Sequence, residues 1–445
     1  MMNYKNCPLL FTILLYVCNF GSTFNENREI ELNHLFNGIK LDEFSSSHLG
    51  NKFGYFDLPL FTKNRSKTKI IKPPPTTDET IIANGYSCEI HDIVTEDGYI
   101  LRVFRIPNGR KDSRKDYEKI RPPLLLQHGI LCSSDCWTLG DPSKALGFRL
   151  ADEGYDVWIG NNRGTTYSRN HTTLSIDSPQ YWNFSIHELG TKDLPAIIDY
   201  MLNTTGYKQI TYMGHSQGTT QFFILTSVLP EYNKKILVMS ALAPVVYLNN
   251  MHGLVGELSH YSKSLTYVAK FFGIHEVLEH YTFIPVINRL MCYPNSVFLP
   301  VCKFWFFTIV GFDSPQLDKN LVHIISDYCP TGASVKQLQH FSQFTSGKFT
   351  WFDYGPKGNL IEYNSVTPPE YNLNLVTTPV VLHYSTNDYI ATPSEVKKLF
   401  WMLPNLVGLF RVPSNQFNHI DFMWATNVNE LLYNNAIYII KQFLR

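Results

Sequence analysis

The stretch Ile210–Leu225, ITYMGHSQGTTQFFIL, decides the fold class of this chain. Its apolar start is typical of a buried strand, and the residues from Thr219 onward have a helical pattern. Between them, GHSQG at 214–218 fits a strand-to-helix turn so tight that side chains at both glycine positions would collide with neighbouring backbone. Such a turn holds the hydroxyl of Ser216 clear of the sheet, so we predict that Ser216 is a nucleophile. An ordinary turn is the alternative, because the five-residue pattern alone also arises by chance.

Short apolar runs alternate with helical patterns on both sides of this turn. The runs that we predict as strands are Leu124–Leu126, Asp156–Ile159, Ile210–Met213, Ile236–Ala241, Val380–Tyr384 and Gly408–Val412. Two further β-rich runs flank Asp97-Gly98 and indicate a hairpin, and a last helix is expected between Asn427 and Leu444. Strands that alternate with helices predict an α/β fold with a mostly parallel sheet, covered by helices on both faces.

The alternation is interrupted between about residues 247 and 370, where helical and aromatic segments follow one another without clear strands. We interpret residues 247–370 as a mainly helical cap, or lid, inserted between two parts of the core, 78–246 and 371–445. Its expected place is above the strand ends, where the active sites of such sheets lie. Residues 1–23 have the order of a secretory signal peptide, and the polar stretch 24–77 fits a linker or pro-segment.

Composition limits the classes of partner. The 38 basic residues balance the 38 acidic ones, so no global field would attract nucleic acid or an anionic membrane. No segment reaches the roughly 20 apolar residues of a transmembrane helix, and the strongest internal run is Phe304–Val310. The signal and four glycosylation sequons fit secretion or lysosomal delivery. The sequons are at Asn64, Asn170, Asn183 and Asn203.

The cysteines predict little cross-linking. Loss of Cys7 and Cys18 with the signal leaves six of the eight cysteines, too few for a disulfide framework in 445 residues. Cys292 and Cys302 are near enough in sequence to close one small loop. Cys132 and Cys136 fit buried free thiols equally well. A zinc site at those two would need a second pair of ligands nearby in the sequence, so we expect no metal and no cofactor.

A serine hydroxyl becomes a good nucleophile only when a histidine takes its proton and a carboxylate orients that histidine. Asp388 follows the strand at 380–384, where a loop would aim it at Ser216, although an Asn-Asp turn residue is the alternative. The rival carboxylates Asp327 and Asp353 fall within the predicted cap. His419 lies in the loop before the last helix, at the position expected for the base.

Two other histidines have a weaker claim to this role. His383 falls within a predicted strand and His323 within the cap, so structural roles are expected for both. In the segment FNHIDF, Asp421 leaves a capping or surface role open for the residues around His419.

The tetrahedral intermediate of such a reaction needs two N–H donors for its oxyanion. The backbone N–H of Gln217, at the start of the helix after Ser216, is the first that we predict. The second comes from the loop after the strand at 124–126, and Ile130 is the predicted donor. His128-Gly129 would equally suit any turn at the end of a strand.

The chain from about Asp78 to its C-terminus resembles the acid lipases of the α/β-hydrolase fold, the family of gastric and lysosomal acid lipases. The resemblance is carried by VTEDGYILRVFRIPNG, LLLQHGI, LADEGYDVWIGNNRGTTYSR, KDLPAIIDYML, YMGHSQGTTQF, ALAPV, STNDYIATP and FNHIDF. It implies the triad Ser216, Asp388 and His419, the oxyanion donors Gln217 and Ile130, and a cap disulfide between Cys292 and Cys302. Ile130 replaces the family's customary leucine, which is harmless because only its backbone N–H is needed.

The resemblance further implies a neutral lipid, or a lipid–water interface, as the partner: triacylglycerols or sterol esters of long-chain fatty acids, reached after the lid moves. The aromatic cluster of Phe304, Trp305, Phe306, Phe307 and Phe312 fits acyl or interface contact, with core packing as the alternative. Two other functions stay open: an esterase for small soluble esters, and an inactive lipid-binding member of the fold. The sequence does not determine the oligomeric state.

Overall fold

The computed structural model describes residues 74–110, 121–259, 261–278, 291–293, 296–311 and 315–444. The predicted signal peptide, residues 24–73 of the predicted pro-segment and Asn64 lie outside these ranges. So do Phe312 and the side chains of Trp305 and Phe306.

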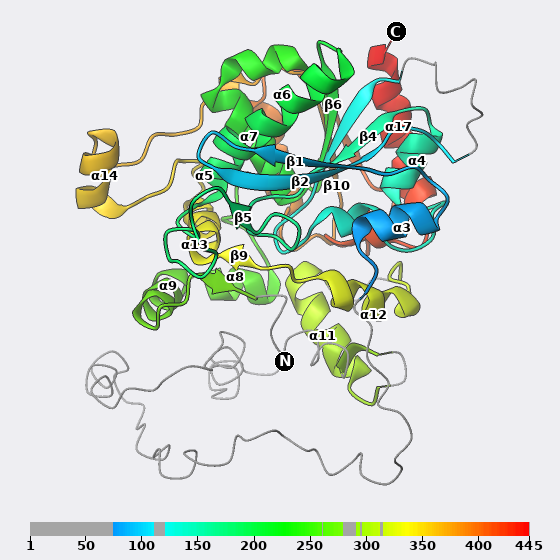
Figure 1. Cartoon of the computed structure of the whole chain (residues 1–445). Coiled ribbons are helices and arrows are strands. Elements are labelled where there is room, and N and C mark those ends of the chain that lie inside the picture. Colours follow the sequence, from blue (N-terminus) through cyan, green and yellow to red (C-terminus); the bar gives the residue numbers. More distant parts are fainter. Residues whose placement is uncertain are drawn as a thin grey trace. The chain divides into compact units, whose positions relative to one another are not determined.

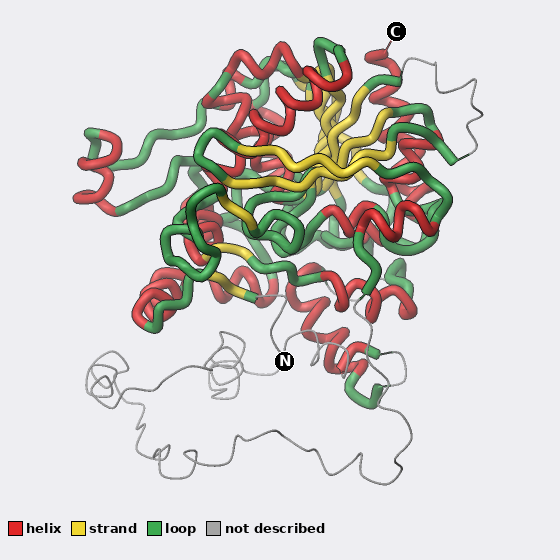
Figure 2. The backbone as a smooth tube through the Cα atoms, viewed as in Figure 1, coloured by secondary structure: helices red, strands yellow, loops and turns green. Residues whose placement is uncertain are grey.

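A nine-stranded sheet forms the centre of the protein (Figure 2). Its main path runs in the order β1-β2-β4-β3-β6-β7-β10-β11, and β5 pairs with β2 at the side. The pairs from β4 to β11 are parallel, whereas β1, β2 and β5 pair antiparallel. The strands are β1 Glu89–Val94, β2 Tyr99–Ile106, β3 Pro123–Gln127, β4 Asp156–Ile159, β5 Asn170–His171, β6 Ile210–His215, β7 Ile236–Leu242, β10 Val380–Tyr384 and β11 Leu406–Arg411. The predicted mostly parallel sheet is therefore confirmed.

The strand that precedes Ser216 lies in the middle of the sheet, and every residue of β6 is buried. It pairs with β3 through Gln127 and Gly214, and with β7 through Met213 and Ser240. Parallel strands end at the same edge, so Ser216 emerges beside the loop that follows Gln127. This register brings the turn at Ser216 next to the loop that contains Ile130.

Helices cover both faces of the sheet (Figure 1). One face carries α6 and α7, and the other carries α4 and α17. The bounds are α3 Thr77–Ala83, α4 Leu146–Asp152, α5 Ile186–Glu188, α6 Leu194–Thr205, α7 Gln217–Val228, α15 Pro393–Met402, α16 Asp421–Trp424 and α17 Asn434–Lys441. The last helix, predicted as one element, begins with a π-helical turn at Asn429–Tyr433 and ends in a 3₁₀ turn at Gln442–Leu444.

The predicted cap region contains mainly helices, most of which lie below the sheet in Figure 1. They are α8 Gly253–Ser259, α9 Ser262–Phe271, α11 Leu299–Val310, α12 Lys319–Tyr328, α13 Val335–Gln343 and α14 Gly355–Tyr363. The sequence shows no clear strand there, but the structure contains one short strand pair. Two short strands, β8 Glu276–Val277 and β9 Ala333–Ser334, pair antiparallel, and two residues are too few to leave an alternating sequence pattern. Within the described ranges, the helices are all too short or too polar to cross a bilayer.

A buried arginine fixes the hairpin of β1 and β2 to the core. The guanidinium of Arg163 donates to Asp97 in the hairpin turn and to Asp193 before α6, with a shortest nitrogen–oxygen distance of 2.6 Å to each. The same group lies 3.9 Å from the ring centre of Tyr99. Arg163 and Asp193 have almost no exposed side-chain surface, so these bonds compensate two charges that water does not reach.

Candidate active site

Ser216 occupies a strained turn between β6 and α7. Its φ of 53° and ψ of −119° are unfavourable for a residue with a side chain. A Cβ atom at Gly214 would lie 2.8 Å from the carbonyl carbon of Gly218, and one at Gly218 would lie 2.2 Å from the carbonyl oxygen of Gln127. Both positions therefore accept only glycine, and the turn places the side chain of Ser216 at the carboxyl edge of the sheet.

Asp388 and His419 form a buried pair near this edge. The Nδ1–H of His419 donates to Asp388 Oδ2 at 2.8 Å, and Asp388 Oδ1 accepts from the backbone N–H groups of Ile390 and Ala391. The carboxylate therefore has three donors, and its side chain has no exposed surface. This arrangement fixes the imidazole with its proton on Nδ1 and leaves Nε2 able to accept a proton.

His215 connects this pair to the turn that carries Ser216. Its ring centre lies 4.9 Å from that of His419, and its Nε2–H donates to the carbonyl oxygen of His419 at 2.9 Å. Burial lowers the pKa of His215 to about 3, so this ring stays neutral. Within the described residues, no hydrogen bond joins the Ser216 hydroxyl to His419; catalytic hydrogen bonds often tighten only when substrate binds.

The two predicted oxyanion donors belong to segments next to Ser216. Gln217 is the first residue of α7, so its backbone N–H is free of the helix's own hydrogen bonds. Its side-chain oxygen accepts from the Gln337 amide of α13, which ties this residue to the cap. Ile130 follows Gly129, where a Cβ atom would lie only 3.1 Å from the Cβ of Ser216. The loop after β3 therefore passes directly beside the serine.

The side chain of His128 holds that loop in place through two hydrogen bonds. Its Nδ1–H donates to the carbonyl oxygen of Gly129 at 2.7 Å, and its Nε2 accepts from the backbone N–H of Asn162 at 3.1 Å. Burial lowers the pKa of His128, which keeps the ring in this neutral form. The sequence motif around His128-Gly129 did not reveal this supporting role, because Asn162 belongs to the loop after β4.

The end of α11 contacts the loops that carry the acid and the base. The backbone N–H of His419 donates to the carbonyl oxygen of Val310 at 3.1 Å. The side-chain amide of Asn418 donates to the carbonyl oxygen of Gly311 at 3.2 Å. A Cβ atom at Gly311 would lie 2.1 Å from the carbonyl oxygen of Asn387. The predicted cap is thus in direct contact with His419 itself and with Asn387 and Asn418, the neighbours of Asp388 and His419 in the sequence.

The other carboxylates and histidines considered from the sequence make contacts that support the structure. Asp353 accepts from the backbone of Gly355 and the side chain of Asn359, within the segment that leads into α14. His383 is buried on β10, where burial lowers its pKa to about 4, and it stacks on Phe410. Asp421 is buried and accepts from the backbone N–H of Asn418, so it braces the loop that carries His419.

Two other groups of predicted residues lie within the described ranges. Cys292 and Cys302 form a disulfide with a sulfur–sulfur distance of 2.00 Å. Asn170, Asn183 and Asn203 are exposed, as glycosylation requires.

Comparison with known proteins gives extended matches. A family model described as a partial alpha/beta-hydrolase lipase region matches residues 77–141, and one for the alpha/beta hydrolase fold matches residues 122–267. Lipase 1 of Drosophila melanogaster is 39% identical over 383 residues, which cover 85% of this chain and 83% of that protein. Gastric triacylglycerol lipase of Bos taurus is 37% identical over 382 residues, with coverage of 84% and 94%. Lipase member K of Mus musculus is 37% identical over 366 residues, with coverage of 81% and 89%.

Proposed function

Because the chain belongs to the acid lipase family of the α/β-hydrolases and is a carboxylic ester hydrolase, we propose that it cleaves esters of long-chain fatty acids through an acyl-enzyme on Ser216. Triacylglycerols and sterol esters are the proposed substrates. The proposed route is secretory, to the outside of the cell or to lysosomes, in agreement with the exposed sequons.

In the proposed reaction, Ser216 Oγ attacks the ester carbonyl while His419 Nε2 takes the hydroxyl proton. Asp388 stabilises the imidazolium that forms, and the N–H groups of Gln217 and Ile130 stabilise the oxyanion. The tetrahedral intermediate collapses as His419 gives its proton to the leaving alcohol. Water, activated by the same imidazole, then attacks the acyl-enzyme and releases the fatty acid.

The single observation that carries this proposal is the buried 2.8 Å hydrogen bond between His419 and Asp388, beside the strained turn at Ser216. Strain at a residue other than glycine persists only where the surrounding structure enforces it, and it is concentrated at functional sites. A structural role for His419 alone would not account for three donors on Asp388 or for the turn that presents the serine.

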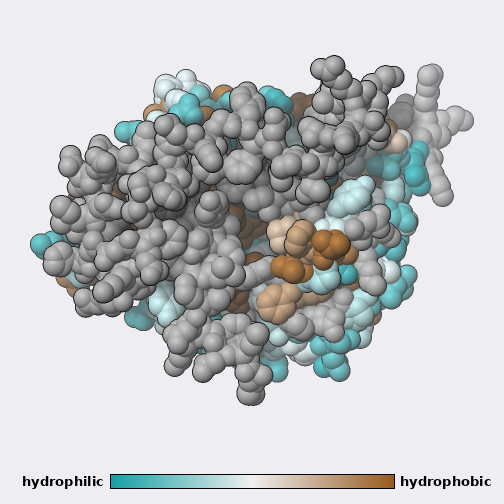
Figure 3. Space-filling view, turned by 90° about the horizontal axis from the view of Figure 1, so that it is seen from below, coloured by the Kyte–Doolittle hydropathy of each residue, from teal (hydrophilic) through white to brown (hydrophobic). Residues whose placement is uncertain are grey.

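Exposed apolar side chains around the start of α11 support a lipid substrate. Val297 is 84% exposed and Phe298 55%, and Val301 and Phe304 are also exposed on the same helical segment. Figure 3 shows hydrophobic residues gathered on the side of the molecule where α11 lies. Contiguous apolar surface of this kind is typical of sites that contact membranes or lipid droplets. Small soluble esters would not require it.

The catalytic proposal is tested with Ser216→Ala and a fluorophosphonate probe. We expect kcat to fall by at least about 10⁴-fold, and labelling to be lost, with an unchanged melting temperature. Ser240→Ala is the matched control, because Ser240 lies buried on the neighbouring strand and its hydroxyl has no partner among the described residues. Unchanged turnover in Ser216→Ala would refute the mechanism, and a wild-type protein that resists the probe would favour the inactive lipid-binding alternative.

The substrate class is tested separately with the double variant Val297→Ser and Phe298→Ser. Turnover of emulsified long-chain triacylglycerol is expected to fall about tenfold, while turnover of a short soluble ester stays unchanged. Ile361→Ser is the control, because this residue on α14 is 82% exposed and lies outside α11. Equal loss on both substrates, or better wild-type turnover of the soluble ester, would support an esterase instead.

A further inference from the structure

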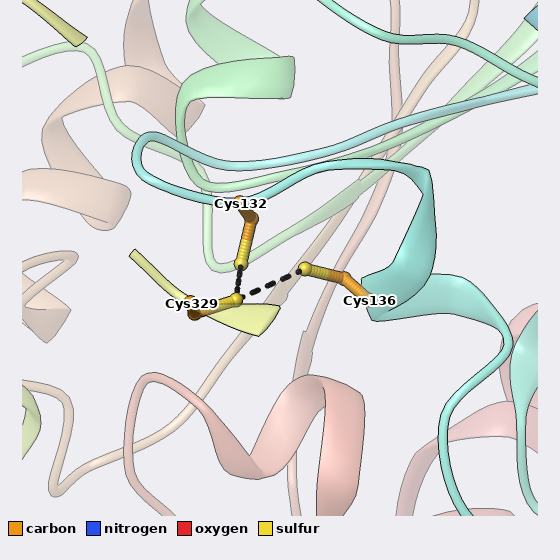
Figure 4. Close-up of side chains that lie close together, drawn as sticks. All are labelled: Cys132, Cys136 and Cys329. Atoms are coloured by element: carbon orange, nitrogen blue, oxygen red, sulfur yellow. Dashed lines mark hydrogen bonds between the residues drawn. The ribbon is translucent and has the colours of Figure 1, made fainter. Parts of the chain in front are cut away.

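Three cysteines from distant parts of the chain meet beside the loop that contains Ile130 (Figure 4). Cys132 lies in that loop, Cys136 in the 3₁₀ helix Ser134–Trp137, and Cys329 directly after α12. The sulfur of Cys329 is 3.1 Å from that of Cys132 and 3.8 Å from that of Cys136. Cys132 and Cys136 are free thiols, as one of the two interpretations of the sequence had it, and the fold adds a third sulfur from 193 residues away.

The surroundings of this cysteine cluster do not favour a metal ion. A structural zinc site takes four ligands, and among the described residues these three sulfurs are the ones that lie within 4.8 Å of one another. The carboxylate of Asp135 is already bonded to the hydroxyls of Thr77, Ser133 and Tyr167.

The three sulfurs are instead close enough for a thiolate to accept a hydrogen bond from a neighbouring thiol. Hydrogen bonds from Cys136 and Cys329 lower the pKa of Cys132 below its usual value, whereas burial raises that of Cys136. The thiolate is the form of cysteine that attacks a disulfide, and a second thiol within contact distance then resolves the mixed product. The disulfide between Cys292 and Cys302 indicates that the chain folds where thiols are oxidised.

We propose that Cys132 and Cys329 form a second disulfide, which ties the cap to the loop of Ile130 and exchanges with Cys136. This bond would reinforce contacts that are already present. The backbone N–H of Thr331 donates to the carbonyl oxygen of Leu131, and its hydroxyl donates to that of Cys132. A covalent tie at this point restrains the predicted oxyanion donor and the cap together.

The oxidant is a disulfide of small-molecule or oxidoreductase type, such as glutathione disulfide. The Cys132 thiolate attacks one of its sulfurs and expels the other as a thiolate. Cys329 then loses its proton and attacks the sulfur of Cys132, which releases the second thiolate, so the two electrons lost by the cysteines reduce the oxidant to two thiols. Attack by the Cys136 thiolate on Cys329 would move the bond to Cys136–Cys329 and free Cys132, with no net oxidation.

The test is a disulfide map of the full-length secreted protein, alkylated without reduction. Cleavage before Asp135 separates Cys132 from Cys136, so mass spectrometry identifies the partner of Cys329 directly. We expect the Cys132–Cys329 pair in the wild type and the Cys136–Cys329 pair in Cys132→Ser. Complete alkylation of all three thiols in the unreduced protein, or an exclusive Cys136–Cys329 bond in the wild type, would overturn the proposal.

Two further measurements separate this bond from a metal site and from the enzyme's activity. Cys329→Ser should lower the melting temperature by about 5 °C without reduction, while Cys88→Ser, a free thiol outside the cluster, should not. If the wild type retains one equivalent of zinc and Cys329→Ser does not, the cluster is a metal site and the disulfide proposal is wrong. None of these readouts requires turnover, so the bond is judged independently of the proposed function.

Discussion

Replacement of Asp388 by asparagine tests how the carboxylate controls the tautomer of His419. The side-chain oxygen of the asparagine would keep the two bonds from the N–H groups of Ile390 and Ala391, so the loop should remain in place. Its amide nitrogen would face His419 Nδ1, where Asp388 Oδ2 now accepts a hydrogen bond at 2.8 Å. To avoid two opposed donors, the imidazole must move its proton to Nε2, which then has no lone pair for Ser216.

The size of the effect follows from this change of tautomer. Only the minor fraction of molecules with the proton on Nδ1 would remain competent, and the imidazolium would lose its counter-charge. We expect kcat to fall about 10³–10⁴-fold, which corresponds to about 4–5.5 kcal/mol of transition-state stabilisation. The assay is steady-state hydrolysis of a short soluble ester, with circular dichroism melting curves as the check on folding.

Asp353→Asn is the matched control for this variant. Asp353 Oδ1 also accepts two N–H donors, from Gly355 and Asn359, and an asparagine would keep both. Its kcat should stay within about twofold of the wild type. A kcat for Asp388→Asn within tenfold of the wild type, in a protein that melts normally, would refute the assignment of Asp388 as the residue that orients the base.

Three further predictions address the pH dependence, the core and the turn. Burial raises the pKa of Asp135 from 3.8 to about 6, so the folded protein binds this proton more tightly than the unfolded chain. The stabilisation that comes from this proton is therefore complete below the unfolded pKa of 3.8 and is lost as the pH rises through about 6. Between about pH 7 and pH 4.5, urea unfolding should show the wild type gaining about 2 kcal/mol over Asp135→Asn, and parallel pH profiles would contradict this. Arg163→Met leaves Asp193 buried without its cation and should cost about 3–5 kcal/mol in the same assay; a loss below about 1 kcal/mol would count against it. Gly129→Ala puts a Cβ atom 3.1 Å from that of Ser216 and should lower kcat about tenfold. Unchanged kinetics would contradict this, because the loop would then move without disturbing Ser216.

The central sheet was predictable because its parallel strands are buried on both faces. Such strands appear as continuous apolar runs, and the predicted bounds of β4 and β10 agree with the structure. The predicted start of the edge strand β11 is two residues late and its predicted end one residue late, since its residues are partly buried or exposed and its register with β10 shifts near Val380. An edge strand lacks the second covered face that makes the pattern continuous.

Parts of the candidate site depend on contacts that a single sequence does not reveal. Ser216, Asp388 and His419 could be proposed from the sequence because each follows a recognisable strand in the expected order. The bond between Gln337 and Gln217, and the approach of Cys329 to Cys132, join the cap region to the core over more than a hundred residues. Such pairings are set by how the two regions pack, and local patterns carry no trace of them.

The junction at Val310 and Gly311 has a practical consequence for redesign. Grafting a foreign lid to change acyl-chain preference would replace the carbonyl groups that receive the N–H of His419 and the amide of Asn418. A chimera that exchanges α11 as a whole would thus also alter the position of His419, the proposed base. Crossover points chosen before Val310 would let engineers vary the exposed apolar residues at the start of α11 while the native end of the helix is preserved.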